Sequence, residues 1–116
     1  MIKKWIEVTF QEEGIHFYPD CDLDGVEFLK YQHRHLFYFY VKIEVFHNDR
    51  DIEFILLKRE LQDFMRSDIK KMNGKSCEML AEDIINYLSL EYPSRDITVR
   101  VYEDNENGAI LEYTKD

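Results

Sequence analysis

Residues 36–46, LFYFYVKIEVF, carry the clearest secondary-structure signal in this chain. Apolar side chains occupy every second position, and polar or amphipathic side chains fill the positions between them. The apolar set is Phe37, Phe39, Val41, Ile43 and Val45, and the opposite set is Tyr38, Tyr40, Lys42 and Glu44. Because successive side chains of a β-strand point to opposite faces of its sheet, this alternation predicts a strand with one buried face.

The segments on either side predict further strands. Residues 5–10 alternate in the same way and are expected to form a strand. A turn is expected at 47–50, followed by a short strand at 51–55. Near the end of the chain, residues 96–102 and 109–113 predict a hairpin across a polar, Asn- and Gly-containing turn.

Two segments have the spacing of amphipathic helices. The apolar stripe of the first is Leu57, Leu61, Phe64 and Met65, and that of the second is Leu80, Ile84, Ile85 and Leu88. Ser76 is the expected N-cap of the second helix, with acidic Glu78 in its first turn. Strand pairs separated by a helix pair predict an α+β fold, an antiparallel sheet with both helices on one face.

Length and composition narrow the class of protein. The 116 residues are enough for one domain, expected to span 1–116, and 45% hydrophobic content can fill its core. A net charge of −9 disfavours binding to nucleic acid or to an anionic membrane, since both require a positive field. We expect no membrane span and no signal peptide. The two cysteines form no disulfide framework, which favours a cytoplasmic location.

Histidines are the first group that suggests chemistry. His33 and His35 are two residues apart on a strand and share the alternation of the apolar face, and His16 follows the first strand. Three imidazoles with an open fourth position form the catalytic type of zinc site. The alternative is a pair of structural histidines that pack at the end of a strand and are satisfied by the backbone.

Glu103 is the second such feature, because it continues the alternation of Ile97, Val99 and Val101. A carboxylate facing inward is costly unless it is paired. Adjacent N–H donors on a guanine-like or pterin-like ring edge would satisfy it. The alternative is a strand that ends one residue earlier and leaves Glu103 in the solvated turn.

The two cysteines are less informative. Cys21 lies in an acidic loop, DCDLD (20–24), where neighbouring negative charge disfavours the reactive thiolate. Cys77, at the start of the second predicted helix, is expected to pack rather than react.

The order of these features resembles a known family. His16, the His33-x-His35 pair, the helix start SCEMLA (76–81) and the strand end VRVYE (99–103) follow one another as in the 6-pyruvoyl-tetrahydropterin synthase and 6-carboxytetrahydropterin synthase family. The resemblance covers almost the whole chain. It implies the tunnelling (T-fold) architecture, in which sheets join into barrel-like oligomers, often two stacked trimers, so a homo-oligomer and most simply a hexamer is expected.

The resemblance also implies roles for individual residues. Zinc would be held by His16, His33 and His35, with Arg34 in place of the glycine of the family's His-Gly-His motif. A pterin ring would be anchored by Glu103. Ser76 matches the hydroxyl residue that begins the family's second helix and would hold the amino-pyrimidine edge of the ring together with Glu103. The dipeptide EF (53–54) corresponds to an Asp-Phe pair before the first helix.

The family's proton-transfer residues are replaced. Leu29 stands where the family has its cysteine, and Ile69 stands where it has the histidine of an Asp-His couple, although Asp68 is retained. Asp68, Glu27 and Cys21 are the candidates for a rearranged proton shuttle. Without general acid–base catalysis, the rate of the family's reaction is expected to be lower by roughly 10²–10⁴-fold.

Three functions remain open from the sequence. The first is a zinc-dependent, lyase-like enzyme acting on a pterin or nucleotide-derived compound. The second is a catalytically inactive T-fold protein that binds a pterin, purine or nucleotide as a sensor or accessory subunit. The third is a structural oligomeric module without a ligand.

Overall fold

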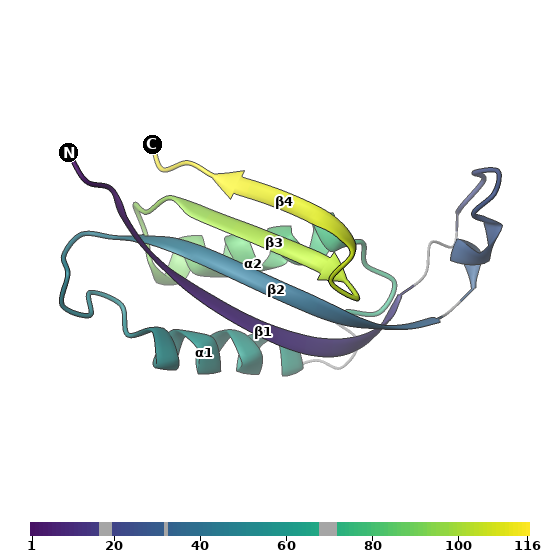
Figure 1. Ribbon diagram of the computed structural model, residues 1–116, viewed down its shortest axis with the longest axis horizontal. Coiled ribbons are helices and arrows are strands. Elements are labelled where there is room, and N and C mark those ends of the chain that lie inside the picture. The colour runs from purple at the N-terminus through teal and green to yellow at the C-terminus, as the bar shows by residue number, and fades with distance from the viewer. Residues whose placement is uncertain (17–19, 32, 68–71) are drawn as a thin grey trace.

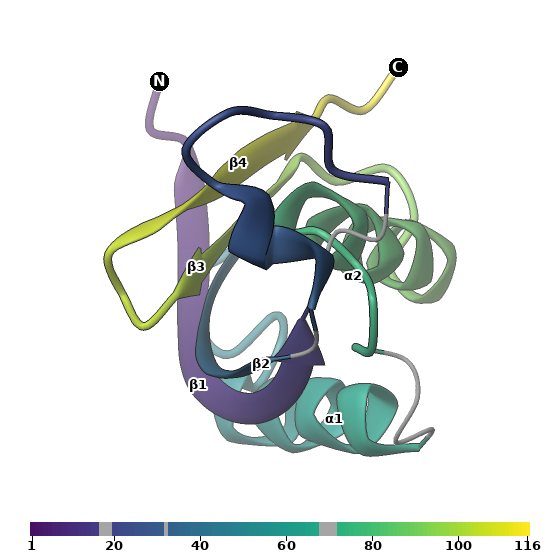
Figure 2. The ribbon, with the colours of Figure 1, turned by 90° about the vertical axis from the view of Figure 1, so that its right-hand side faces the viewer.

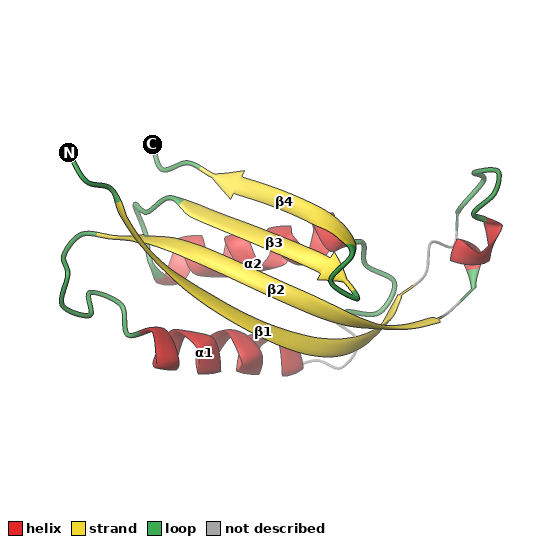
Figure 3. Ribbon diagram, viewed as in Figure 1, coloured by secondary structure: helices red, strands yellow, loops and turns green. Residues whose placement is uncertain are grey.

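A computed structural model describes residues 1–16, 20–31, 33–67 and 72–116. Within them it contains one four-stranded sheet, two α-helices and a short 3₁₀ helix (Figures 1 and 3). The elements are β1 (Lys4–His16), η1 (Glu27–Lys30), β2 (His33–Val45), α1 (Phe54–Arg66), α2 (Cys77–Glu91), β3 (Ile97–Glu103) and β4 (Asn107–Tyr113). The expected α+β class and β-β-α-α-β-β order are confirmed.

The sheet is antiparallel throughout, with strand order β1-β2-β3-β4. Helix α1 packs on β1, and α2 packs on β3 and β4. Viewed end-on, both helices lie on the concave side of the curved sheet (Figure 2). The expectation of two helices on one face is therefore confirmed.

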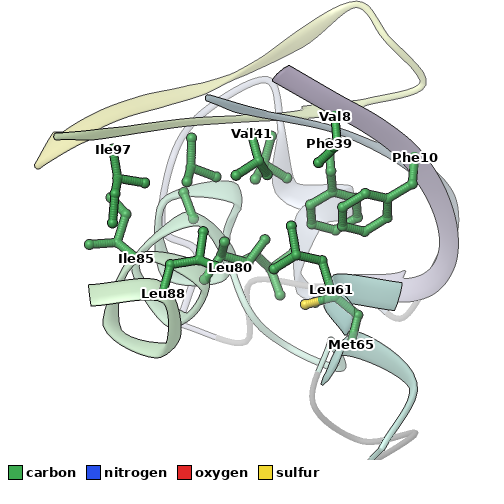
Figure 4. Packing of buried hydrophobic residues seen from close by; sticks show 14 of the residues in the cluster. Val8, Phe10, Phe39, Val41, Leu61, Met65, Leu80, Ile85, Leu88 and Ile97 are labelled. Carbon is green, nitrogen blue, oxygen red and sulfur yellow. The ribbon is translucent and has the colours of Figure 1, made fainter. Parts of the chain in front are cut away.

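The core lies between this face of the sheet and the helices (Figure 4). The apolar set predicted for the central strand is buried, and Phe39 of β2 stacks on Phe10 of β1 with ring centroids 4.7 Å apart. The helices contribute Leu57, Leu61 and Met65 from α1 and Leu80, Ala81, Ile84, Ile85 and Leu88 from α2. The amphipathic pattern of the sequence thus gives a continuous apolar interior.

Polar and aromatic contacts bridge the two helices. Phe64 of α1 stacks on Tyr87 of α2 with centroids 4.4 Å apart. The Glu60 carboxylate accepts hydrogen bonds from the hydroxyls of Tyr87 and Tyr92. Burial and the bond to Glu60 raise the pKa of Tyr92 to about 12, so this hydroxyl remains a donor at neutral pH.

The prediction of a short strand at 51–55 is wrong. These residues form a bend that leads directly into α1 at Phe54. Glu53 is the N-cap of α1, because its Oε1 accepts a hydrogen bond from the backbone N–H of Ile55 at 2.7 Å. A strand here would also need a partner, and β2 is already flanked by β1 and β3.

β1 extends well beyond the expected 5–10. Its alternation of apolar side chains weakens at Gln11, yet the ladder with β2 continues to the pair His16↔His33. Backbone hydrogen bonds sustain this part of the strand, and they leave no periodic signal in the sequence.

Candidate functional site

The inward face of the sheet changes from apolar to polar at one end. On β2, His35 comes two residues before the buried Phe37. On β3, Glu103 comes two residues after the buried Val101. Glu103 pairs with Phe37 on one side and Asn107 on the other. It therefore belongs to the strand, and the alternative of a strand ending one residue earlier is excluded.

His35 lies between two carboxylates. Its Nδ1 is 2.6 Å from Asp104 Oδ2, and its Nε2 is 3.6 Å from Glu103 Oε2. The His35 and Glu103 side chains are about a quarter exposed, whereas that of Asp104 is nearly half exposed. Each ring nitrogen of His35 therefore faces a carboxylate.

Asp104 is held in the turn between β3 and β4. It has φ +52°, a left-handed conformation that Asp and Asn tolerate better than most residues. Its Oδ1 accepts from the backbone N–H of Leu36 at 3.2 Å, and its own N–H donates to the Leu36 carbonyl at 2.7 Å. Asp104 was not among the residues predicted from the sequence. The Asp-Asn pair after a strand is a turn signal, but nothing local connects it to His35.

The start of α2 reaches the same region. Ser76 is the N-cap as expected, and its Oγ accepts from the N–H of Met79 at 3.1 Å. A pocket of about 230 Å³ is lined by Ser76, Cys77, Glu78, Glu103, Asn107 and Gly108. Two residues chosen from separate parts of the sequence, Ser76 and Glu103, thus line one pocket.

Cys77 is buried beside this pocket. Burial, together with the charges of Glu103 and Glu78, raises the pKa of its thiol to about 12. The thiol is therefore protonated and unreactive at neutral pH, consistent with the expected packing role.

The three histidines lie at the same end of the sheet, but only the side chain of His35 is described. The backbone register pairs His16 directly with His33 and pairs His35 with Gly14, so all three belong to the same end of the β1–β2 ladder. The side chains of His16 and His33 lie outside the described residues. Among the described residues, no group of three His, Cys, Asp or Glu side chains is arranged to hold a metal.

The backbone of Gly14 is closely packed against side chains of the core. A Cβ atom there would lie 3.0 Å from side-chain atoms of both Met72 and Phe37. Met72 is buried and joins the core at this end. Apolar packing therefore reaches close to the backbone that carries the histidines.

The candidate proton-shuttle residues are not brought to this pocket by any described contact. Glu27 is exposed, and hydrogen bonds from its own backbone N–H and then from that of Gly25 lower the pKa of its carboxyl. Cys21 is buried and its thiol donates to the Val26 carbonyl at 3.7 Å. Both lie in a segment that projects beyond the sheet (Figure 1). Asp68 lies outside the described residues.

Glu12 is a charged residue that the sequence analysis missed. It lies on β1 opposite Phe37, and its side chain is only 13% exposed. Its Oε1 forms an ion pair with Arg66 Nε at 2.9 Å, and this oxygen accepts no hydrogen bond from the described residues. Extending the alternation of Val8 and Phe10 by one step would have found it.

Comparison with known proteins identifies no family for this chain. No protein-family model matches the chain, and no curated protein matches its sequence. No helix among the described residues is long and apolar enough to cross a membrane.

Proposed function

We propose that this chain is a divergent T-fold protein, similar to the 6-pyruvoyl-tetrahydropterin and 6-carboxytetrahydropterin synthases, that binds zinc and a pterin- or purine-type ring. The observation that carries the proposal is the pocket shared by Ser76 and Glu103. These are the two positions that the resemblance assigns to the ring. The α+β layout and strand order are compatible with that assignment.

Glu103 is the ring anchor in this proposal. Its carboxylate lies at the pocket wall, three-quarters buried, and has two oxygens that can accept from adjacent N–H groups of an amino-pyrimidine edge. The pocket is smaller than the roughly 300–1,000 Å³ typical of sites that enclose a whole ligand. It would therefore hold the edge of a bicyclic ring and leave the rest of the ligand outside.

His16, His33 and His35 are the proposed zinc ligands. Imidazole nitrogen suits zinc, and the backbone register groups the three residues at one end of the sheet. His35 fits this use, because a carboxylate already engages one of its ring nitrogens. Bound zinc would polarise an oxygen on the ligand.

The chain's own residues supply little proton transfer in this arrangement. Leu29, in η1, carries no titratable group, and neither does Ile69, which stands where the family has its histidine. Cys77, the thiol at the pocket, stays protonated at neutral pH. This favours a protein that binds its ligand without the family's usual turnover, as a sensor or accessory subunit.

The proposal includes a homo-oligomer in the cytoplasm. Strands β1 and β4 form the two edges of the described sheet, and unpaired edge strands favour association. Both cysteines are buried free thiols, which suits a reducing compartment.

Ligand binding tests the proposal directly. Purified protein loaded with zinc would be titrated with biopterin and with guanosine by calorimetry. We expect binding of at least one of them, lost in Glu103→Gln. Glu106→Gln is the matched control, because Glu106 is exposed in the same turn and the substitution removes the same charge. Absence of binding to the wild-type protein, or equal binding by both variants, would contradict the proposal.

A further inference from the structure

We propose that Asp104 is a positioning residue that fixes the tautomer of His35 and so presents Nε2 of that ring to a metal ion. The inference rests on the proposed zinc function. It assigns a role to a residue outside the three histidines, in a turn that the resemblance did not include.

The contact with Asp104 determines which nitrogen of the imidazole carries the proton. An ionised carboxylate can only accept hydrogen bonds, so the 2.6 Å contact between His35 Nδ1 and Asp104 Oδ2 requires Nδ1 to donate. In the neutral ring the lone pair is then on Nε2. Metal-binding histidines commonly have their other ring nitrogen engaged by a carboxylate in this way.

Asp104 is itself held in place by the backbone of β2. Its other oxygen accepts from the backbone N–H of Leu36, and its backbone N–H donates to the carbonyl of the same residue. Leu36 is the residue that follows His35 in β2. The carboxylate is therefore fixed relative to the strand that carries the imidazole.

A second carboxylate, that of Glu103, lies on the opposite side of the ring. Nε2 is 3.6 Å from Glu103 Oε2. If Nε2 carried the proton, it would direct that proton toward Glu103 and could not bind a metal. The bond to Asp104 places the proton on the other nitrogen, so a cation near Nε2 would meet both an imidazole lone pair and a negative oxygen.

Asp104→Asn tests this inference with little change in shape. The amide oxygen can still accept from Leu36, and Asn tolerates the left-handed backbone. Its NH₂ group, however, donates to Nδ1 and so favours the tautomer with the proton on Nε2. Asn105→Gly is the control, because it alters the same turn and removes the hydrogen bond from the Tyr40 hydroxyl while leaving the Asp104 carboxylate in place.

Two measurements decide the outcome. Nitrogen-15 NMR of the metal-free protein at pH 8 should show His35 protonated on Nδ1 in the wild type and Asn105→Gly, and a shift toward Nε2 in Asp104→Asn. Zinc affinity, measured by competition with a chromophoric chelator, should fall about 10–100-fold in Asp104→Asn alone. Thermal melting of the metal-free proteins checks that all three are folded.

The inference is overturned if wild-type His35 is protonated on Nε2, or if Asp104→Asn binds zinc as tightly as the wild type. Failure of the wild-type protein to bind zinc would instead overturn the proposed zinc function. In that case the tautomer measurement still decides whether Asp104 controls the proton of His35.

Discussion

The buried carboxylate of Glu44 accepts a hydrogen bond from the backbone N–H of Asp96 at 3.1 Å, which joins the end of β2 to the residue before β3. Lys115 Nζ donates to the same Glu44 oxygen at 2.9 Å, and the backbone N–H of Lys115 donates to Asp96 Oδ1 at 2.8 Å. Lys3 pairs with Asp96 from the other terminus. Two carboxylates thus attach both ends of the chain to the sheet.

This arrangement predicts that the protein loses stability in acid. The hydrogen bond from Lys115 and, to a smaller extent, the one from the Asp96 backbone lower the pKa of Glu44 below its ordinary 4.5. The hydrogen bond from Lys3 lowers the pKa of Asp96 below its ordinary 3.8. Carboxyls with a lower pKa in the folded chain stabilise it above their unfolded pKa, and this is lost as pH falls through the folded value. We expect the melting temperature to be level near neutrality and to fall below about pH 4.5. A shallower fall in Glu44→Gln is expected, and an unchanged slope would contradict the assignment.

Loss of the α2 cap should have a measurable cost. Ser76→Ala removes the acceptor for the N–H of Met79 and is expected to lower the free energy of unfolding by about 1 kcal/mol. Ser76→Asp restores a capping oxygen and should recover most of the loss in urea denaturation. The added charge lies in the pocket with Glu103, so this variant should still bind the ring more weakly than the wild type. Equal stability of the Ala variant and the wild type would exclude the capping role.

Metal content is the next prediction. We expect about one zinc per chain after reconstitution at neutral pH, with none retained by His33→Ala. His47→Ala is the control, since His47 lies in the loop after β2, at the other end of that strand. Because metal binding is linked to folding, zinc should also raise the melting temperature of the wild type and not that of His33→Ala. A wild-type protein without zinc would refute the three-histidine site.

Turnover of dihydroneopterin triphosphate, the usual substrate of the family that the chain resembles, is expected to be absent or very slow. The reaction needs groups that move protons, and Leu29 and Ile69 cannot do so. Product formation would be followed by chromatography with fluorescence detection. A rate of about 1 per second or more, typical of enzymes, would show that another group supplies the proton transfer.

The last prediction concerns assembly. β1 and β4 are the edges of the described sheet, and β1 extends over 13 residues, a length that favours pairing with another chain. Light scattering coupled to size-exclusion chromatography should give a homo-oligomeric mass, most simply that of a hexamer. A monomeric mass at micromolar concentration would contradict it.

Local pattern was sufficient for much of the fold. The alternation at 36–46, the two helical stripes and the Ser76 cap each involve residues close together in the chain, and each is confirmed. The inward position of Glu103 follows from the same alternation. The zinc, ring and family assignments remain predictions.

Only the tertiary structure decided the rest. The length of β1 depends on its ladder with β2. The residues at 51–55 lead into α1 because both edges of β2 are already paired, with β1 and β3, and because Glu53 caps the helix. Asp104 meets His35 across the sheet because β3 pairs with β2 and ends in a left-handed turn at that position. Such contacts join residues far apart in sequence, and they depend on strand register and turn geometry, which residue spacing does not encode.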